Sequence, residues 1–151
     1  MAKVKLTKTA LKQQRDNLKQ FLRFLPTLQL KKQQLQMEMR LCLEQISRNE
    51  ERERKSKEEI ASWIGLFGSE KEVLRVADAV RIEKVNTDTL NIAGVEVPRF
   101  QGVAFENTPY DLFQEDLWVD DAVAAVKKIV ELRIEREVIR RQFELIRQEL
   151  R

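Results

Sequence analysis

The stretch FLPTLQLKKQQLQMEM, from Phe24 to Met39, lies within a longer part of the chain whose apolar residues recur every seven positions. Counted in heptads from Val4, the a and d positions up to Asn49 number fourteen, and ten of them are apolar. A heptad repeat sustained over this length predicts one coiled-coil helix. Pro26 stands inside the repeat without shifting its register, and an interior proline bends a helix. The sequence therefore predicts a long helix with a bend at Pro26.

The composition of the 151-residue chain is that of a helical protein with few loops. Charged residues make up 35% of it and aromatic residues 7%, with only four glycines and three prolines. Such a profile is typical of long helices and coiled coils. The 28 basic and 25 acidic residues are of mixed sign, which argues against a one-sided surface for nucleic acid.

The residue types that most often build reactive sites are scarce. Histidine is absent, which removes the commonest general base and metal ligand. Cys42 is the single cysteine, and we expect it to be a small apolar residue of the helix seam. No apolar run approaches the ~20 residues that span a bilayer. We therefore expect a soluble, cytoplasmic protein that does not insert into the membrane.

The run RNEERERKSKEE, from Arg48 to Glu59, is almost wholly charged. Pairs four residues apart, Glu50 with Arg54 and Glu51 with Lys55, support a helix through it. Charge runs of this kind usually face water, so the sequence predicts a solvated stretch of helix here.

Between residues 63 and 112 the pattern changes to that of a small α/β insert. Ser69 and Glu72 have the spacing of a capping box, which predicts a short helix over Ser69–Val80. The following residues are rich in Val and Ile, and a turn at Ala93 and Gly94 predicts a β-hairpin. This register places four apolar residues on one face: Leu90, Ile92, Val95 and Val97. Pro98 cannot donate to a strand ladder, so its strand lies at an edge.

The last segment begins a second helix after the start signals Thr108, Pro109 and Asp111. A heptad stripe runs from Trp118 to Leu150 with nine of its ten positions apolar, and a second apolar stripe lies beside it. A face of this width meets more than one neighbour.

The sequence thus predicts a mainly α protein, a long antiparallel two-helix coiled coil with a small α/β insert that contains a β-hairpin. The predicted divisions are 1–62, 63–112 and 113–151. The second helix is shorter and should end near Leu25–Leu30, which leaves part of the first helix without a partner in the chain. We expect incomplete burial of five residues: Leu11, Leu18, Phe21, Leu22 and Leu25.

No motif of catalysis stands out. The sequence holds no phosphate-binding loop, dinucleotide fingerprint or nucleophile elbow. Asp120 and Asp121 are paired carboxylates at the start of a helix, where they suit the helix dipole. The sequence predicts no catalytic, cofactor-binding or metal-binding residue, and hence a protein that is not an enzyme.

Four segments, in this order, resemble the D subunit of the V-type and A-type rotary ATPases, most closely that of the bacterial branch. They are KLTKTAL (5–11), FLPTLQLKKQQLQMEM (24–39), NIAGVEVPRFQGVAFE (91–106) and LWVDDAV (117–123). The resemblance implies a rotor shaft, the central stalk, whose coiled coil lies within the ring of catalytic A and B subunits. It further implies contacts of the insert with the F subunit and with the membrane-side socket of the stalk, and a cytoplasmic location peripheral to the membrane. Such a shaft couples ATP hydrolysis or synthesis to transport of protons or sodium ions without cofactors.

Members of this family continue beyond the last residue of this chain, so we expect a C-terminal truncation, or a partner that supplies the missing seam, including a second copy of the chain. A bend at Pro26 makes a shaft asymmetric, although a kink without function remains an equal reading. Exposed basic residues are candidates for contact with the catalytic ring: Lys12, Arg15, Lys19, Arg23, Lys31, Lys32, Arg140, Arg141 and Arg147.

Two other classes remain open. A prefoldin-like chaperone also has helices that flank β-hairpin structure, but the insert here is larger than such a hairpin needs. A nucleic-acid-binding coiled-coil arm requires a one-sided basic stripe with exposed aromatic residues, and the mixed charges make it the weakest reading.

Overall fold

The computed structural model describes residues 6–67, 76, 78–106 and 117–151. Its elements in chain order are helix α1 (Lys8–Phe67), strand β1 (Ile82–Ile92), strand β2 (Val95–Phe105) and helix α3 (Leu117–Leu150). The predicted fold class, two long helices with a small β-hairpin between them in sequence, is confirmed.

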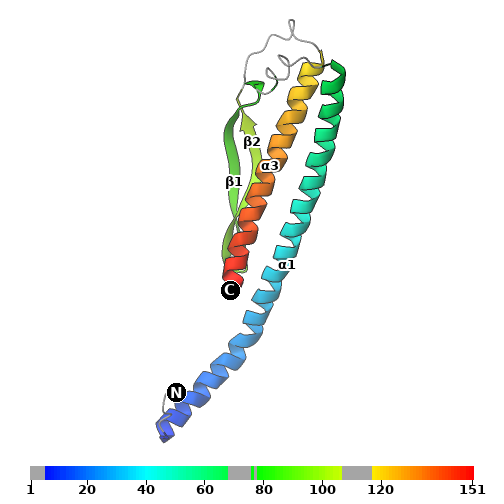
Figure 1. The fold of residues 1–151 in the computed structure, drawn as a ribbon. Helices are drawn as coiled ribbons and strands as arrows, with labels where there is room; N and C mark the ends of the chain where they lie inside the picture. Colours follow the sequence, from blue (N-terminus) through cyan, green and yellow to red (C-terminus); the bar gives the residue numbers. More distant parts are fainter. Residues whose placement is uncertain (1–5, 68–75, 77, 107–116) are drawn as a thin grey trace.

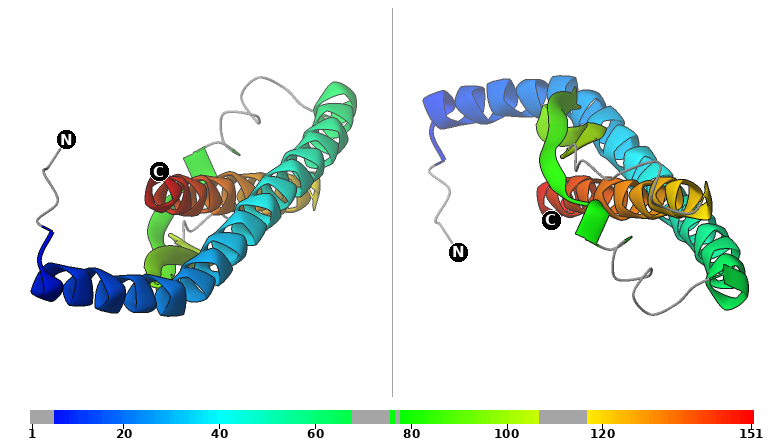
Figure 2. Two further views of the ribbon diagram at one scale, coloured as in Figure 1. Left: turned by 90° about the horizontal axis from the view of Figure 1, so that it is seen from below. Right: turned by 90° about the horizontal axis from the view of Figure 1, so that it is seen from above.

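Helices α1 and α3 run antiparallel and side by side, and the hairpin lies along α3 (Figure 1). The hairpin packs on α3, and its turn also lies beside Lys31 of α1. The N-terminal part of α1 extends past the C-terminal end of α3, and within its blue part α1 changes direction (Figures 1 and 2). Pro26 lies inside α1, and its missing amide hydrogen and its ring account for a bend there.

The start of α1 is capped by the side chain of Thr7. The Oγ1 atom of Thr7 accepts a hydrogen bond from the amide of Ala10 at 3.2 Å, and the helix begins at Lys8. This bond satisfies one of the amides that a helix start leaves without a partner.

The main core forms where the two heptad stripes meet the hairpin. Leu35 and Cys42 of α1 are buried with Ile139 and Ile146 of α3, and Val97 of β2 completes the cluster. Cys42 is thus the apolar seam residue that the sequence predicts, and burial raises the pKa of its thiol, with a further contribution from Glu38.

A second cluster lies at the opposite end of the pair of helices. Val119, Ala122 and Val123 of α3 are buried there together with Val76. The main core joins α1 to α3 and the hairpin, whereas the second cluster packs Val76 against the start of α3.

The hairpin turns at Ala93 and Gly94, which have φ of 51° and 88°. Gly94 donates from its amide to Oδ1 of Asn91 at 3.0 Å, which supports the turn. Ile92 pairs with Val95, as the predicted register requires.

The two strands differ in burial. Val97 of β2 is 1% exposed, whereas its partner Leu90 on β1 is 38% exposed. The difference arises because β2 packs on α3 and β1 lies on the outside of the hairpin. Gln142 of α3 donates a hydrogen bond to the carbonyl oxygen of Pro98, which ties β2 to the helix.

The contact between α1 and α3 ends close to the position that the sequence predicts. Nζ of Lys31 lies 3.3 Å from Oε1 of Glu149, and Leu150 packs against the main core. The five residues expected to lack a complete partner are exposed by half or more: Leu11, Leu18, Phe21, Leu22 and Leu25.

We refer to residues 8–30 of α1 as the arm and to residues 31–63 as the braced segment. Helix α1 itself ends at Phe67, beyond residue 62, the predicted end of the first division. The predicted helix over Ser69–Val80, for most of its length, and the start signals Thr108, Pro109 and Asp111 lie outside the described residues.

Candidate functional site

The charged run of α1 contains a buried polar layer, which corrects the prediction that this stretch is simply solvated. Asn49, Glu53 and Ser56 are only 4%, 5% and 6% exposed. They are consecutive d, a and d positions of the same heptad repeat, which continues to Ile60 and Trp63. Continuing the heptad count past Asn49 is the signal that locates this layer in the sequence, because buried positions follow the repeat whatever their polarity.

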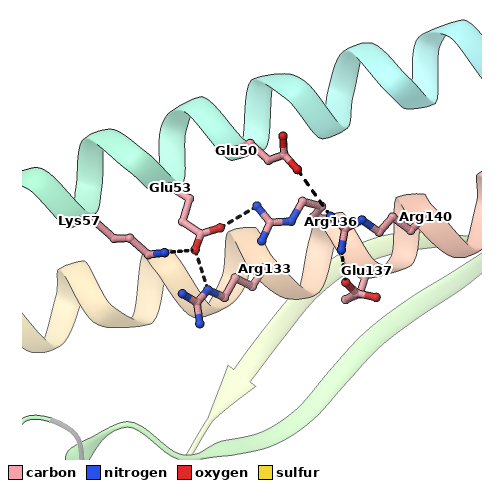
Figure 3. Close-up of polar contacts among 7 residues, drawn as sticks. All are labelled: Glu50, Glu53, Lys57, Arg133, Arg136, Glu137 and Arg140. Atoms are coloured by element: carbon pink, nitrogen blue, oxygen red, sulfur yellow. Dashed lines mark hydrogen bonds and ion pairs between the residues drawn. The ribbon is translucent and has the colours of Figure 1, made fainter.

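Glu53 is the centre of the layer and lies between the two helices (Figure 3). Its Oε2 atom is 2.6 Å from Nη1 of Arg136, and its Oε1 atom is 2.7 Å from Nε of Arg133, both on α3. Lys57, one turn along α1, places its Nζ atom 2.8 Å from the same Oε1 atom. Both oxygens of one buried carboxylate are therefore used, and three cations surround it.

These partners keep Glu53 ionised. The hydrogen bond from Lys57, together with those from Arg133 and Arg136, lowers the pKa of Glu53 from 4.5 to about 2 although burial acts in the opposite direction. A carboxylate with this pKa carries its full charge at neutral pH, so the layer is ionic under physiological conditions.

Further ion pairs surround the layer on the exposed side. Oε1 of Glu50 lies 3.5 Å from Nη2 of Arg140, and Nη1 of the same arginine lies 2.7 Å from Oε1 of Glu137 (Figure 3). The predicted pair of Glu50 with Arg54 is therefore wrong, since Glu50 reaches across to α3. Arg54 contacts Glu51 and Glu58 instead, and the predicted pair of Glu51 with Lys55 is present at 3.7 Å.

The layer is not fully satisfied by protein groups. Among the described residues, neither Nδ2 of Asn49 nor Nε of Arg136 has a hydrogen-bond partner, although both are buried. Burying polar donors in this way costs free energy. The described residues contain no group of three or more His, Cys, Asp or Glu side chains suited to a metal ion.

The arm carries a different kind of surface. Residues 8–27 contain five basic side chains and a single acidic one, Asp16. Large apolar side chains are exposed between them, with Phe21 at 72% and Leu22 at 62%. A contiguous apolar surface with charged residues around it is typical of an interaction site.

The basic residues that the sequence singles out fall into three groups. Lys12, Arg15, Lys19 and Arg23 are exposed on the arm. Lys31 and Lys32 lie at the junction with the end of α3, where Lys31 pairs with Glu149. The remaining three lie on α3: Arg140, Arg141 and Arg147. Of these, Arg140 forms an ion pair with Glu50, and Arg147 forms one with Glu144. The structure thus does not gather these residues into one patch.

The end of the helix pair farthest from the arm holds a small apolar pocket. It has a volume of about 140 Å³, and its lining includes Trp63 of α1 and Trp118 of α3 together with Val76. None of the helices in the described ranges has a stretch long and apolar enough to cross a membrane.

Comparison with known proteins gives one consistent answer. Residues 10–151 match the family of ATP synthase D subunits. The V-type ATP synthase D subunit of Borreliella burgdorferi is 39% identical over 151 residues, which cover 100% of this chain and 73% of that protein. The D subunits of Chlamydia felis and Chlamydia caviae are 30% and 29% identical over 150 residues, which cover 99% of this chain and 72% of each relative. These relatives give no support to the prefoldin-like alternative.

Proposed function

Since this chain belongs to the family of ATP synthase D subunits, we propose that it acts as the central shaft of a rotary V-type ATP synthase. In this role it is a stalk subunit that couples ATP hydrolysis or synthesis to rotation and to ion transport. The observation that carries the proposal is the pairing of a braced two-helix segment with an arm of α1 that continues beyond it (Figure 1).

A shaft has to transmit torque without its two helices moving past each other. The braced segment meets this need, because the main core and the ionic layer both join α1 to α3. The hairpin adds a third layer along α3.

The arm is the part that we assign to the ring of catalytic A and B subunits. Its exposed cations, Lys12, Arg15, Lys19 and Arg23, fit an acidic partner surface, and the apolar side chains between them supply area to bury. Arg141 and Arg147 on α3 and Lys32 at the junction would make separate contacts with the ring, since they do not form one patch with the arm cations. A bend at Pro26 would turn the arm off the axis of the braced segment, so that the three catalytic sites would meet different faces of it.

The hairpin and the far end of the helix pair are the parts left for the other stalk partners. We assign the exposed face of β1 to the F subunit, and the end that holds Trp63 and Trp118 to the membrane-side socket subunit. The protein would then lie in the cytoplasm at the periphery of the membrane.

The shaft would act without chemistry of its own. A rotor shifts each catalytic site between conformations by binding them unequally, and this needs contact residues and no catalytic ones. The absence of a phosphate-binding loop and of histidine from the sequence supports a non-catalytic role.

In the absence of a ring, the exposed seam of the arm favours a second copy of the same chain as its partner. Each fully buried Leu or Phe side chain contributes ~1.5–3 kcal/mol, so pairing of two such seams is favourable. We therefore propose that the isolated chain self-associates through its arm.

Reconstitution with the catalytic A and B subunits tests the proposal. The parent chain should co-purify with the ring and restore ATP-driven rotation of a bead attached to its hairpin. Reversal of the four arm cations to Glu should reduce retention on the ring at least tenfold, whereas reversal of Arg48, Arg52 and Lys55 on the braced segment should not. Equal retention of both variants would contradict the assignment of the arm.

A further inference from the structure

Between Leu35 and Trp63 of α1, the buried layer is the one interruption of the apolar seam, and it covers three consecutive seam positions. On α1, Leu35 and Cys42 are buried on one side of the layer, and Ile60 and Trp63 follow on the other. Between them the seam positions Asn49, Glu53 and Ser56 are polar and at most 6% exposed. A polar residue at a single level of a coiled coil is a known means of fixing the alignment of its helices.

The matching feature on α3 is Arg136. It is the one position of the stripe from Trp118 to Leu150 that is not apolar, and its side chain is 15% exposed. The two charges that interrupt the two seams therefore face each other, with Nη1 of Arg136 2.6 Å from Oε2 of Glu53.

A slip of one heptad would separate these charges. Because the helices are antiparallel, the slip would place Glu53 opposite Ile129 or Phe143, and Arg136 opposite Ile46 or Ile60. The apolar positions elsewhere would still meet apolar positions, so they discriminate weakly between the alignments. Two buried, unpaired charges would discriminate strongly.

The layer has the properties of a device for alignment and not for stability. A buried ion pair contributes little net stability compared with apolar residues of similar size, and its best-attested use is to fix register. The donors of Asn49 and Arg136 that lack partners among the described residues point the same way, because a seam selected for stability alone would not bury them.

We propose that Glu53 and Arg136 are positioning residues that fix the axial register of α1 against α3. With the register fixed, a torque applied at one end of the pair reaches the other end without sliding of the helices. That consequence rests on the proposed shaft function, whereas the register itself is measured on the chain alone.

Cross-linking between exposed positions reads the register directly. Glu50 and Arg140 are half exposed and lie across the helix interface, with Oε1 and Nη2 3.5 Å apart, so the pair Glu50→Cys with Arg140→Cys reports the native alignment. The pair Glu50→Cys with Arg147→Cys reports a slip of one heptad in one direction, and Leu43→Cys with Arg140→Cys reports the other. Each pair is made in a Cys42→Ala background and treated, when dilute, with a short bismaleimide.

With Glu53 and Arg136 intact, we expect intramolecular cross-links in the native pair and less than about a tenth of that yield in either slipped pair. In the double variant Glu53→Leu/Arg136→Leu, which removes both charges and keeps an apolar seam, the yield of the slipped pairs should rise about tenfold or more. The variant Glu53→Asp keeps the carboxylate, so it should give the same pattern of cross-links as the parent chain. Peptide mass spectrometry identifies the linked positions, and circular dichroism establishes that each variant is helical.

The matched control removes an ion pair of similar length from the exposed face of α1. Nη1 of Arg54 and Oε1 of Glu58 are 2.6 Å apart, and the variant Arg54→Leu/Glu58→Leu should leave the cross-linking pattern unchanged. If the seam variant stays helical and cross-links only in the native pair, the hairpin tip beside Lys31 fixes the register and the proposal is wrong. Slipped cross-links in the parent chain would overturn it as well.

Discussion

Leu28 and Leu35 are d positions of the same heptad repeat, one heptad apart on the same helix, and their surroundings are opposite. Leu28 on the arm is 61% exposed, whereas Leu35 on the braced segment is 2% exposed. The heptad pattern runs through both without a break. The difference shows that the repeat specifies which face of a helix is apolar, and that contact with α3 decides which part of this face is buried.

The largest expected effect on stability is the difference between substitutions of these two leucines. Leu35→Ala should reduce the free energy of unfolding by about 2–4 kcal/mol, since it leaves a cavity in the main core. Leu28→Ala should change it by less than about 0.5 kcal/mol, because the side chain is already in water. Urea denaturation followed by circular dichroism measures both, and equal losses would remove the distinction between arm and braced segment.

The next largest effect on stability is the difference between a buried and an exposed carboxylate of the braced segment. Glu53→Gln should reduce the free energy of unfolding at pH 7 by about 2 kcal/mol, because it weakens charge-assisted hydrogen bonds at a buried site. Glu50→Gln, at its half-exposed neighbour, should cost less than about 0.5 kcal/mol.

Lowering the pH tests whether Glu53 stabilises the fold through its charge. The folded-state pKa of Glu53 is about 2 and lies below its ordinary value of 4.5, so its contribution is complete above pH 4.5 and is lost as the pH falls toward 2. The difference in stability between the parent chain and Glu53→Gln should therefore shrink over this interval. A difference that stays constant from pH 7 to pH 2 would show that Glu53 does not act through its charge.

A third effect concerns the association that the arm permits. Sedimentation velocity over a concentration series should show the parent chain passing from monomer to a larger species. Leu18→Glu, which places a charge within the exposed seam, should remain monomeric at the highest concentration at which the parent has associated. The control Arg48→Glu alters an exposed position of the braced segment and should associate as the parent does. Association of the Leu18→Glu variant at parent concentrations would count against the arm as the contact.

The smallest effect on global stability is expected from Pro26→Ala. This residue lies in the arm, so its replacement should move the midpoint of urea denaturation only slightly. The arm should nevertheless straighten, because alanine restores the amide donor and removes the ring. Distances between spin labels at Lys12 and Arg48 should lengthen in the variant, and unchanged distances would show that the bend has another cause.

The sequence is sufficient for the parts of the fold that depend on local pattern. The heptads predict both helices, and the alternation around Gly94 predicts the register of the hairpin. The position that Leu150 reaches beside α1 also follows, because helix length is proportional to residue number.

The burial of charge does not follow from local pattern. The run around Glu53 has the composition of a solvated stretch, and the partners that make its burial possible are Arg133 and Arg136, about 80 residues away. Glu50 likewise pairs across the interface with Arg140 and not along its own helix. Pairings between helices depend on their relative rotation, which the pattern within either helix does not specify.

Hydrogen exchange along α1 tests the central claim, that one continuous helix is covered by α3 only from about Leu35 onward. The measurement is made by mass spectrometry at a concentration where sedimentation shows a monomer. We predict slow amide exchange through the braced segment from Leu35 to Ser56 and exchange at least a hundredfold faster in the arm before Leu28, since local opening of an uncovered helix needs little free energy. Equal protection on both sides of Lys31 in the monomer would contradict this account.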